Sequence, residues 1–350
     1  MMTSIKTNNM IIFFLLLYCT SSQISFAASE KLTVAMYGGN WGEAFLRCVA
    51  DPFTQETGIA VAAEFGTSTV TLAKLQQQKS KPTIDVAWMD GGISELAYAA
   101  NVLDNLEPTT IPNLKNVLDK AIYTRDAHTF AVSTGFYSLG LIYNTNLVKQ
   151  VPNSWKDLWQ AEFARTIALP SPANSSGVPF LFFLSEVWAI PTSDLTPLYN
   201  KLRILDVALF FDSSGAASNA FQSGEAIIGA HFSVGAWDLI DKGFPINFII
   251  PKEGVWATDT RLHLIKGAPN HQAATQFINK ALSQDAAICL ATRLYLGPAL
   301  KNVELPDEVT RKLPWGKGGS INDLRLFDWR EINVRRAEIT DDWNRKVTNH

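Results

Sequence analysis

The chain has 350 residues, of which 47% are hydrophobic and 18% are charged, and its formal net charge is −3. This composition excludes disorder, collagen and coiled coil for the bulk of the chain, and the length predicts about two domains. Because the sequence carries neither a basic excess nor a basic cluster, we expect no nucleic-acid partner. The 10 Trp and 20 Phe are enough to line a pocket as well as a core.

The first 27 residues have the pattern of a secretory signal peptide. Lys6 gives a positive start, residues 10–17 form an apolar run, and Ser25 and Ala27 place small residues before a cleavage site. The apolar run is too short for a membrane span, which needs about 20 apolar residues. The sequence therefore predicts export, cleavage near Ala27 and a periplasmic mature chain.

From residue 31 to residue 100 the sequence alternates between strand and helix patterns. Strands are predicted over 31–37, 59–65 and 84–89, and helices over 41–57, 69–78 and 93–100. Gly58 has the position expected of a residue that ends a helix. This β-α-β-α-β-α order predicts an α/β fold in which parallel strands have helices on both faces.

The second half of the chain also contains both strand and helix patterns. Strands are predicted over 138–143, 166–169, 226–231, 247–250 and 263–265, and helices over 180–188, 236–242, 271–290 and 328–347. Trp256 and Asp259 are assigned to a turn between strands. Since no flexible linker separates the two halves, we expect two lobes joined by crossing strands rather than independent domains joined by a linker.

Two cysteines, Cys48 and Cys289, remain after the predicted cleavage. An even pair in an exported chain is compatible with one disulfide. Two buried free thiols are the alternative, because the two residues lie far apart in sequence within predicted helices.

No motif of an enzyme or a metal site is present in the sequence. The five histidines lack metal-ligand spacing, and the chain has no Cys-x-x-Cys, G-x-S-x-G or P-loop pattern. Ser233 and His231 are too close on one strand to face each other as nucleophile and base. We therefore expect no catalysis, no metal and no cofactor, with a secreted enzyme as the less favoured alternative.

Polar and aromatic residues follow several of the predicted strands, which is where ligands bind in open α/β sheets. Trp41 follows the first strand and offers a flat apolar wall, and Asp90 follows the third and can hold an ammonium group. Ser175 lies just before an apolar helix whose free N–H groups suit a polar or anionic group. Each of these residues has a simpler structural role as well, in a tight turn or a helix cap.

Several short motifs, each present once, are spread in a defined order over nearly the whole mature chain. They are YGGNWGE at 37–43, PFTQETGI at 52–59, SWKDLW at 154–159, SGE at 223–225 with PKEG at 251–254, and Gly297-Pro298 after Tyr295. In these motifs the chain resembles the spermidine/putrescine-binding group of the periplasmic solute-binding proteins of ABC transporters. The resemblance implies a type II periplasmic binding protein fold, with a ligand cleft between two lobes that close on a small molecule.

The resemblance also implies where the lobes divide and what the chain contacts. Lobe one would take residues 28–134 and 257–302, lobe two residues 135–256, and residues 303–350 would form a helical segment on lobe two or the hinge. The implied partners are a small-molecule ligand and an ABC permease in the inner membrane, and we expect a monomer. A sensor or scaffold protein on the same fold is the alternative.

Carried over residue by residue, the resemblance adds aromatic and charged ligand contacts. It implies that Trp41, Phe136 and Phe232 pack on the ligand, and that Asp259 holds an amine with Tyr295 beside it. Arg330 lies near the position where the group has a Gln. The full expected site is Trp41, Asp90, Phe136, Ser175, Phe232, Asp259, Tyr295 and Arg330.

The loop at 172–175 lacks the two acids that hold a second amine in the spermidine binders. A buried unpaired ammonium group costs several kcal/mol, so this uncharged end, with Arg330 near it, suits a carboxylate. The sequence therefore favours an ω-amino acid or a related zwitterion, with putrescine as the close alternative.

Overall fold

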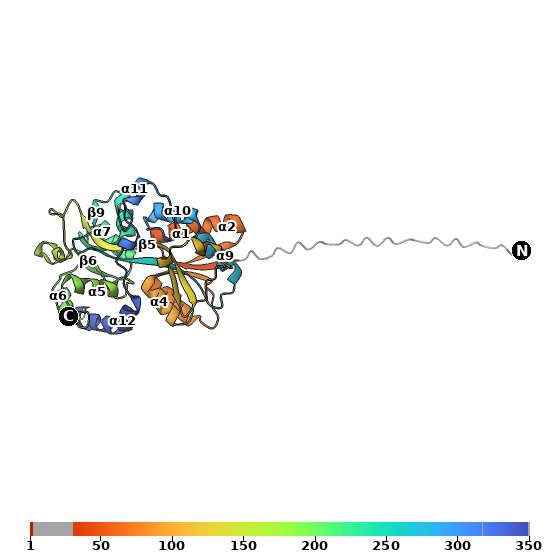
Figure 1. The fold of residues 1–350 in the computed structure, drawn as a ribbon, viewed down its shortest axis with the longest axis horizontal. Coiled ribbons are helices and arrows are strands. Elements are labelled where there is room, and N and C mark those ends of the chain that lie inside the picture. The colour runs from red at the N-terminus through yellow and green to blue at the C-terminus, as the bar shows by residue number, and fades with distance from the viewer. Residues whose placement is uncertain (3–30, 317, 349–350) are drawn as a thin grey trace.

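The computed structural model describes residues 1–2, 31–316 and 318–348. Residues 3–27 of the predicted signal peptide lie outside the described residues. A ten-stranded sheet runs through the molecule in the order β2-β1-β3-β10-β5-β8-β6-β7, with β4 and β9 paired to β5 (Figure 1). The strands are β1 (Lys31–Met36), β2 (Ala60–Phe65), β3 (Val86–Asp90), β4 (Ile122–Arg125), β5 (His128–Asn144), β6 (Ile167–Pro170), β7 (Leu209–Phe211), β8 (Ile228–Phe232), β9 (Ile246–Ile249) and β10 (Trp256–Leu264).

Two groups of elements lie on either side of β5 and β10. We call β1–β3 with α1–α4, α9 and α10 the first lobe, β6–β8 with α5–α8 the second lobe, and β5 and β10 the crossing strands (Figure 1). The helices are α1 (Gly39–Phe45), α2 (Asp51–Thr57), α3 (Ser68–Gln77), α4 (Gly91–Ala99), α5 (Gly177–Val187), α6 (Thr196–Arg203), α7 (Ser214–Ser223), α8 (Ser233–Asp241), α9 (His271–Ala281), α10 (Gln284–Leu294), α11 (Asp307–Thr310) and α12 (Trp329–Trp343).

The predicted β-α-β-α-β-α order of the first lobe is confirmed. β1 pairs in parallel with β2 on one side and with β3 on the other. The helix predicted over 41–57 consists of α1, a π-helical segment at Leu46–Ala50, and α2. Gly58 ends it in the left-handed conformation at φ +74°, where a side chain would add strain.

The crossing strands are much longer than the sequence pattern predicts. β5 spans 17 residues and β10 spans nine, and the turn assigned to Trp256 and Asp259 is wrong because both residues lie inside β10. β10 is buried along its whole length although it contains Asp259 and Arg261. These two charged groups pair with each other, which lets a strand that reads as polar run through the core.

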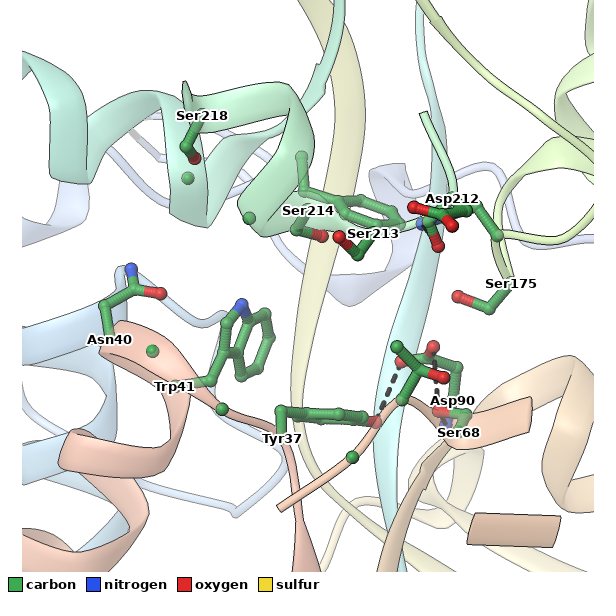
Figure 2. Close-up of a pocket in the computed structure, with 18 of the residues that line it drawn as sticks. Tyr37, Asn40, Trp41, Ser68, Asp90, Ser175, Asp212, Ser213, Ser214 and Ser218 are labelled. Carbon is green, nitrogen blue, oxygen red and sulfur yellow. Dashed lines mark hydrogen bonds between the residues drawn. The ribbon is translucent and has the colours of Figure 1, made fainter. Parts of the chain in front are cut away.

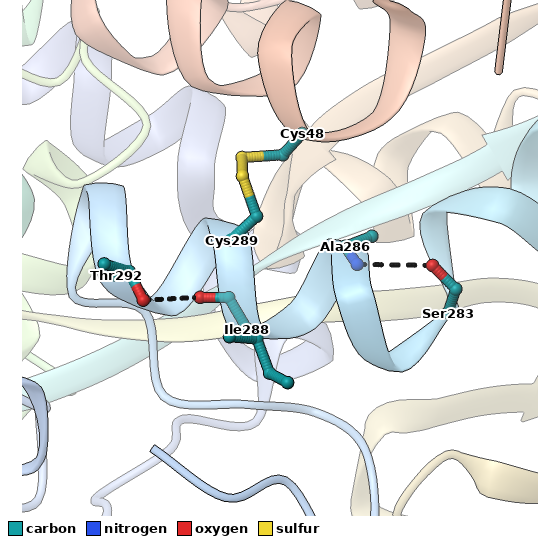
Figure 3. Close-up of a disulfide and its surroundings, with 6 residues drawn as sticks. All are labelled: Cys48, Ser283, Ala286, Ile288, Cys289 and Thr292. Atoms are coloured by element: carbon teal, nitrogen blue, oxygen red, sulfur yellow. Dashed lines mark hydrogen bonds between the residues drawn. A yellow bond between two sulfur atoms is a disulfide. The ribbon is translucent and has the colours of Figure 1, made fainter. Parts of the chain in front are cut away.

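The long helix predicted over 271–290 is divided in two. α9 ends at Ala281, and Ser283 begins α10 by accepting a hydrogen bond from the backbone N–H of Ala286 at 3.2 Å (Figure 3). A serine that caps a new helix interrupts an otherwise continuous apolar stripe. The sequence pattern did not predict β7 and α7, although the loop after β7 and the first turns of α7 line the cavity described below.

A disulfide joins Cys48, in the π-helical segment after α1, to Cys289 in α10 (Figure 3). The Cα atoms are 5.6 Å apart, and the two residues are 241 positions apart in the sequence. The bond therefore connects the beginning of the first lobe to the part of the chain that returns after the second lobe.

The C-terminal helix α12 packs against elements of both lobes. Near its start, Asn333 Nδ2 donates to the Gly92 carbonyl oxygen in α4 at 2.8 Å. At its end, Trp343 makes an edge-to-face contact with Phe210 of β7 at 4.7 Å between ring centroids. The segment thus lies across both groups of elements, and the exact lobe boundaries at 134/135 and 256/257 stay a prediction. Among the described helices, none is long and apolar enough to cross a membrane.

His263 makes the stability of the first lobe sensitive to acid. Its Nδ1–H donates to the Ala87 carbonyl oxygen at 2.9 Å, and its Nε2 lies 2.7 Å from Ser94 Oγ, so the neutral ring is fully hydrogen-bonded. Burial lowers the pKa of His263 from 6.5 to about 3. Between these pH values the unfolded chain binds a proton that the folded chain does not, so acid favours unfolding.

We expect this group alone to remove about 1.6 kcal/mol from the free energy of unfolding on going from pH 6.5 to pH 5. Urea unfolding at several pH values checks the prediction. His263→Gln should flatten the slope of the free energy of unfolding over this range, whereas His128→Gln, at an exposed position, should leave it unchanged. An unaltered slope in His263→Gln would contradict the assignment.

Candidate functional site

A cavity of about 450 Å³ lies between the two lobes, at the edge of the sheet where several strands end. The lining residues are 37–41, 65–69, 90, 137, 174, 175, 212–215, 218, 232 and 235. Most of them follow the carboxyl ends of β1, β2, β3, β6, β7 and β8. This is the edge at which open α/β sheets bind ligands.

Asp90 provides the carboxylate on the first-lobe wall of the cavity, at the end of β3 (Figure 2). Its Oδ1 accepts hydrogen bonds from the hydroxyl groups of Tyr37, at 2.8 Å, and Tyr137, and its Oδ2 accepts from Ser68 Oγ at 3.0 Å. The side chain is only 9% exposed. All three donors are neutral, and in the described part of the chain no Lys, Arg or His forms an ion pair with Asp90.

The two phenols that hold Asp90 keep their protons. Burial and then the nearby Asp90 carboxylate raise the pKa of Tyr37 and of Tyr137 well above the ordinary value of 10. Both hydroxyl groups therefore donate to Asp90 at any physiological pH. The result is a nearly buried anion that three fixed hydroxyl groups orient toward the cavity.

Aromatic rings surround this carboxylate and continue across the cavity. The rings form a chain of edge-to-face contacts from Tyr37 to Trp41, from Trp41 to Tyr137 and from Tyr137 to Phe232. The ring centroids of these pairs are 5.3, 5.1 and 5.0 Å apart. Tyr37 and Trp41 belong to the first lobe, and Phe232 ends β8 of the second. Electron-rich ring faces beside a carboxylate form a surrounding that attracts organic cations.

The opposite wall comes from the second lobe and carries a second carboxylate. Figure 2 shows Asp212, Ser213 and Ser214 with Ser175 facing Tyr37 and Asp90 across the cavity. Asn174 Nδ2 donates to the Asp212 carbonyl oxygen at 3.1 Å, which joins the loop after β6 to the loop after β7. Asp212 itself is exposed.

The charge of the cavity is negative, because its described lining includes two aspartates and no Lys, Arg or His. The starts of α3, α5 and α7 also lie at the cavity and add partial positive charge at their free N–H groups. The site can therefore hold an ammonium group at Asp90 and offers both hydrogen-bond donors and acceptors at the far wall.

Comparison with known proteins places this arrangement in a family. The sequence profile of the bacterial extracellular solute-binding proteins matches residues 49–314 of the chain. The chain belongs to this family. The family and the fold are those of the substrate-binding proteins of ABC transporters, which bind small ligands and deliver them to a membrane permease.

A curated relative of this solute-binding protein is the spermidine/putrescine-binding periplasmic protein 1 of Haemophilus influenzae. The two are 28% identical over 297 residues, which is 81% of this chain and 80% of the relative. The corresponding protein of Escherichia coli is 26% identical over 271 residues, which is 74% of this chain and 75% of that protein.

Solved structures show the same fold. The periplasmic binding protein AgtB of A. tumefaciens R10, in complex with agropinic acid, matches with a TM-score of 0.77 at 16% identity, over 92% of this chain and 100% of that one. This solute-binding protein therefore has the two-lobed type II periplasmic binding protein fold, as the sequence predicted.

Four of the predicted site residues of the solute-binding protein come together in the cavity: Trp41, Asp90, Ser175 and Phe232. Phe136 and Asp259 do not line it. Tyr137 faces the cavity, and successive residues of a strand point to opposite faces, so Phe136 points away. Asp259 lies directly opposite Phe136 in the β5–β10 register, and its carboxylate accepts from Arg261 Nε at 3.0 and 3.1 Å.

Tyr295 and Arg330 also lie outside the lining. The Tyr295 hydroxyl donates to Asp241 at 2.5 Å and lies 2.9 Å from Lys312 Nζ, at the end of α10. Arg330 is 70% exposed and pairs with Asp328 at the start of α12, where it lowers the pKa of the Asp328 carboxyl. The expected cation beside the Ser175 end is therefore absent from the described lining, and an acid, Asp212, is present instead.

Sequence reasoning missed Tyr37, Tyr137 and Asp212. The signal for Asp212 is the apolar triplet Leu209, Phe210 and Phe211 followed by Asp-Ser-Ser-Gly, which marks a short strand, a turn and a helix start. Tyr137 faces the cavity because it lies in a strand that crosses between the lobes. The sequence pattern does not show this, because it predicts a strand that is shorter than β5.

Proposed function

We propose that this protein is the exported solute-binding subunit of an ABC importer, and that it captures a small amine-bearing ligand between its closing lobes. The observation that carries the proposal is Asp90, a nearly buried carboxylate with three neutral donors, a surround of aromatic rings and no cationic partner in the described chain. An ammonium group of the ligand would supply the missing positive charge. The names of the relatives support the same ligand class.

The far end of the cavity favours a second ammonium group over a carboxylate. Considered alone, the uncharged loop at 172–175 favours a ligand with a carboxylate at this end, which would be a zwitterion. The fold, however, places Asp212 next to this loop on the second-lobe wall of the cavity. Asp212 repels a carboxylate and attracts a second ammonium group, although its exposure weakens both effects. We infer that a diamine of the length of putrescine binds more tightly than 4-aminobutyrate.

Export and the membrane partner belong to the same proposal. The apolar run and small residues before Ala28 support secretion through a signal peptide, and a disulfide supports an oxidising compartment. The partner would be an inner-membrane permease with its ATPase, to which a monomer delivers the ligand.

A thermal-shift screen of the purified protein against putrescine, spermidine, 4-aminobutyrate and glycine betaine tests the ligand class. At 100 times its Kd, a ligand should stabilise the protein by about 2.7 kcal/mol. We expect the largest shift with putrescine, and recovery of unaltered putrescine after incubation. A shift with 4-aminobutyrate and none with putrescine would show that Asp212 does not hold the far end, and turnover of the ligand would favour an enzyme.

A further inference from the structure

Behind the second-lobe wall of the cavity lies a buried imidazole, that of His231 at the end of β8. Its Nε2 lies 3.0 Å from Oγ of Ser218, a residue of α7 that lines the cavity. On the other side, a Cβ atom at the cavity residue Gly235 would come within 2.1 Å of the ring. The imidazole thus fills the space between α7 and α8, directly beneath two residues that face the ligand space.

The surroundings of this ring determine its protonation. His231 is fully buried, and the rings of Phe211 and Phe221 lie with centroids 6.5 and 6.3 Å from its own. Burial lowers the pKa of His231 to about 4, so the ring is neutral at pH 7. A neutral imidazole has one donor and one acceptor. Within the described residues Nδ1 has no side-chain partner, and a hydrogen bond with the Phe232 backbone raises the pKa of the ring against the effect of burial, which favours a hydrogen on the nitrogen that faces the backbone. Ser218 is therefore its one side-chain partner there.

We propose that His231 is a positioning residue whose Nε2 accepts the Ser218 hydroxyl hydrogen, so that Ser218 Oγ presents a lone pair to an N–H of the bound ammonium ligand. The inference rests on the proposed function, because the negative cavity needs acceptors for an ammonium group. A hydroxyl that rotated freely would point its hydrogen toward the ligand part of the time. Fixing it as an acceptor makes the wall selective for a ligand that carries N–H hydrogens.

The same pair has the composition of a nucleophile and its base, but its geometry favours positioning over catalysis. A general base works best with a pKa near the operating pH and with a second group that orients the ring. His231 has a lowered pKa, and no side chain of the described residues orients the ring at Nδ1. The ring can direct the hydroxyl without removing its proton.

A double-mutant cycle with putrescine as the probe tests the inference by calorimetry. We expect Ser218→Ala and His231→Leu each to weaken binding by about tenfold, and the double variant to be no weaker than Ser218→Ala alone. His231→Gln should restore part of the loss, because the Gln side-chain oxygen can accept the hydroxyl hydrogen. Ser218 is half-buried, so Ser218→Ala tests the proposal even where a variant of His231 fails to fold.

Losses that add in the double variant would show that His231 acts through packing alone and would overturn the inference. Unchanged affinity in Ser218→Ala would overturn it as well. Both results leave the proposed function intact, since the wild-type protein still binds putrescine. A wild-type protein that binds no amine contradicts the proposed function, and the acceptor role of Ser218 with it.

Discussion

Asp90→Asn is expected to weaken putrescine binding by at least about 30-fold, and by up to a few thousand-fold. Removing one partner of a close, buried charge pair costs about 2–5 kcal/mol, and each 1.4 kcal/mol is tenfold in affinity. The amide keeps the shape of the carboxylate and can still accept from Tyr37, Tyr137 or Ser68, so the loss reports charge rather than packing. Calorimetric titration of the wild type and the variant measures it.

The same substitution should leave the unliganded protein as stable as the wild type or more stable. Asp90 is a nearly buried charge without a cation in the described chain, and its desolvation opposes folding until a ligand binds. Opposite effects on binding and on stability distinguish a ligand-holding carboxylate from a structural one, whose loss would lower both. The midpoint of urea unfolding without ligand provides the second measurement.

Two further carboxylates serve as comparisons for Asp90. Asp212→Asn should weaken putrescine binding by less than Asp90→Asn, because Asp212 is exposed and water screens its charge. Asp119→Asn removes a carboxylate that is 96% exposed and outside the cavity lining, so it should bind as the wild type does. An Asp90→Asn variant that binds putrescine within about threefold of the wild type would contradict the central role of this residue.

The first lobe could be predicted because its local signals agree with its tertiary structure. Apolar strands alternate with helices there, and Gly58 marks a helix end where the fold requires a left-handed residue. Trp41 and Asp90 were identified for the same reason, since both directly follow strands whose carboxyl ends meet at the cavity. Position in a βαβ pattern thus identified two of the four predicted residues that line the cavity.

The crossing strands could not be predicted in the same way. In β10 the segment Thr-Asp-Thr-Arg reads as a turn, because nothing in its spacing shows that Asp259 and Arg261 neutralise each other in the core. Whether Phe136 or Tyr137 faces the cavity depends on the register of a strand whose length the pattern understates. The composition of the pocket, and with it the preferred ligand, depended on these long-range contacts.

Removing the disulfide with the double substitution Cys48→Ala and Cys289→Ala is expected to lower the free energy of unfolding by about 2–5 kcal/mol. The bond closes a loop of 241 residues, and the chain-entropy relation assigns a loop of this size about 5 kcal/mol. Because the loop contains the whole second lobe, the unfolded chain gains much freedom when the bond is lost. For a chain of this size we expect a fall in Tm of about 3–8 °C.

The site should be unaffected by the same change, since neither cysteine lines the cavity. The affinity for putrescine should stay within about twofold, and the wild type in reductant should unfold at the Tm of the double variant. Alkylation of the native protein followed by mass spectrometry shows whether the bond forms: modification of both thiols without reductant would contradict it. A double variant as stable as the wild type would show that packing between α1 and α10 already holds the two ends of the first lobe together.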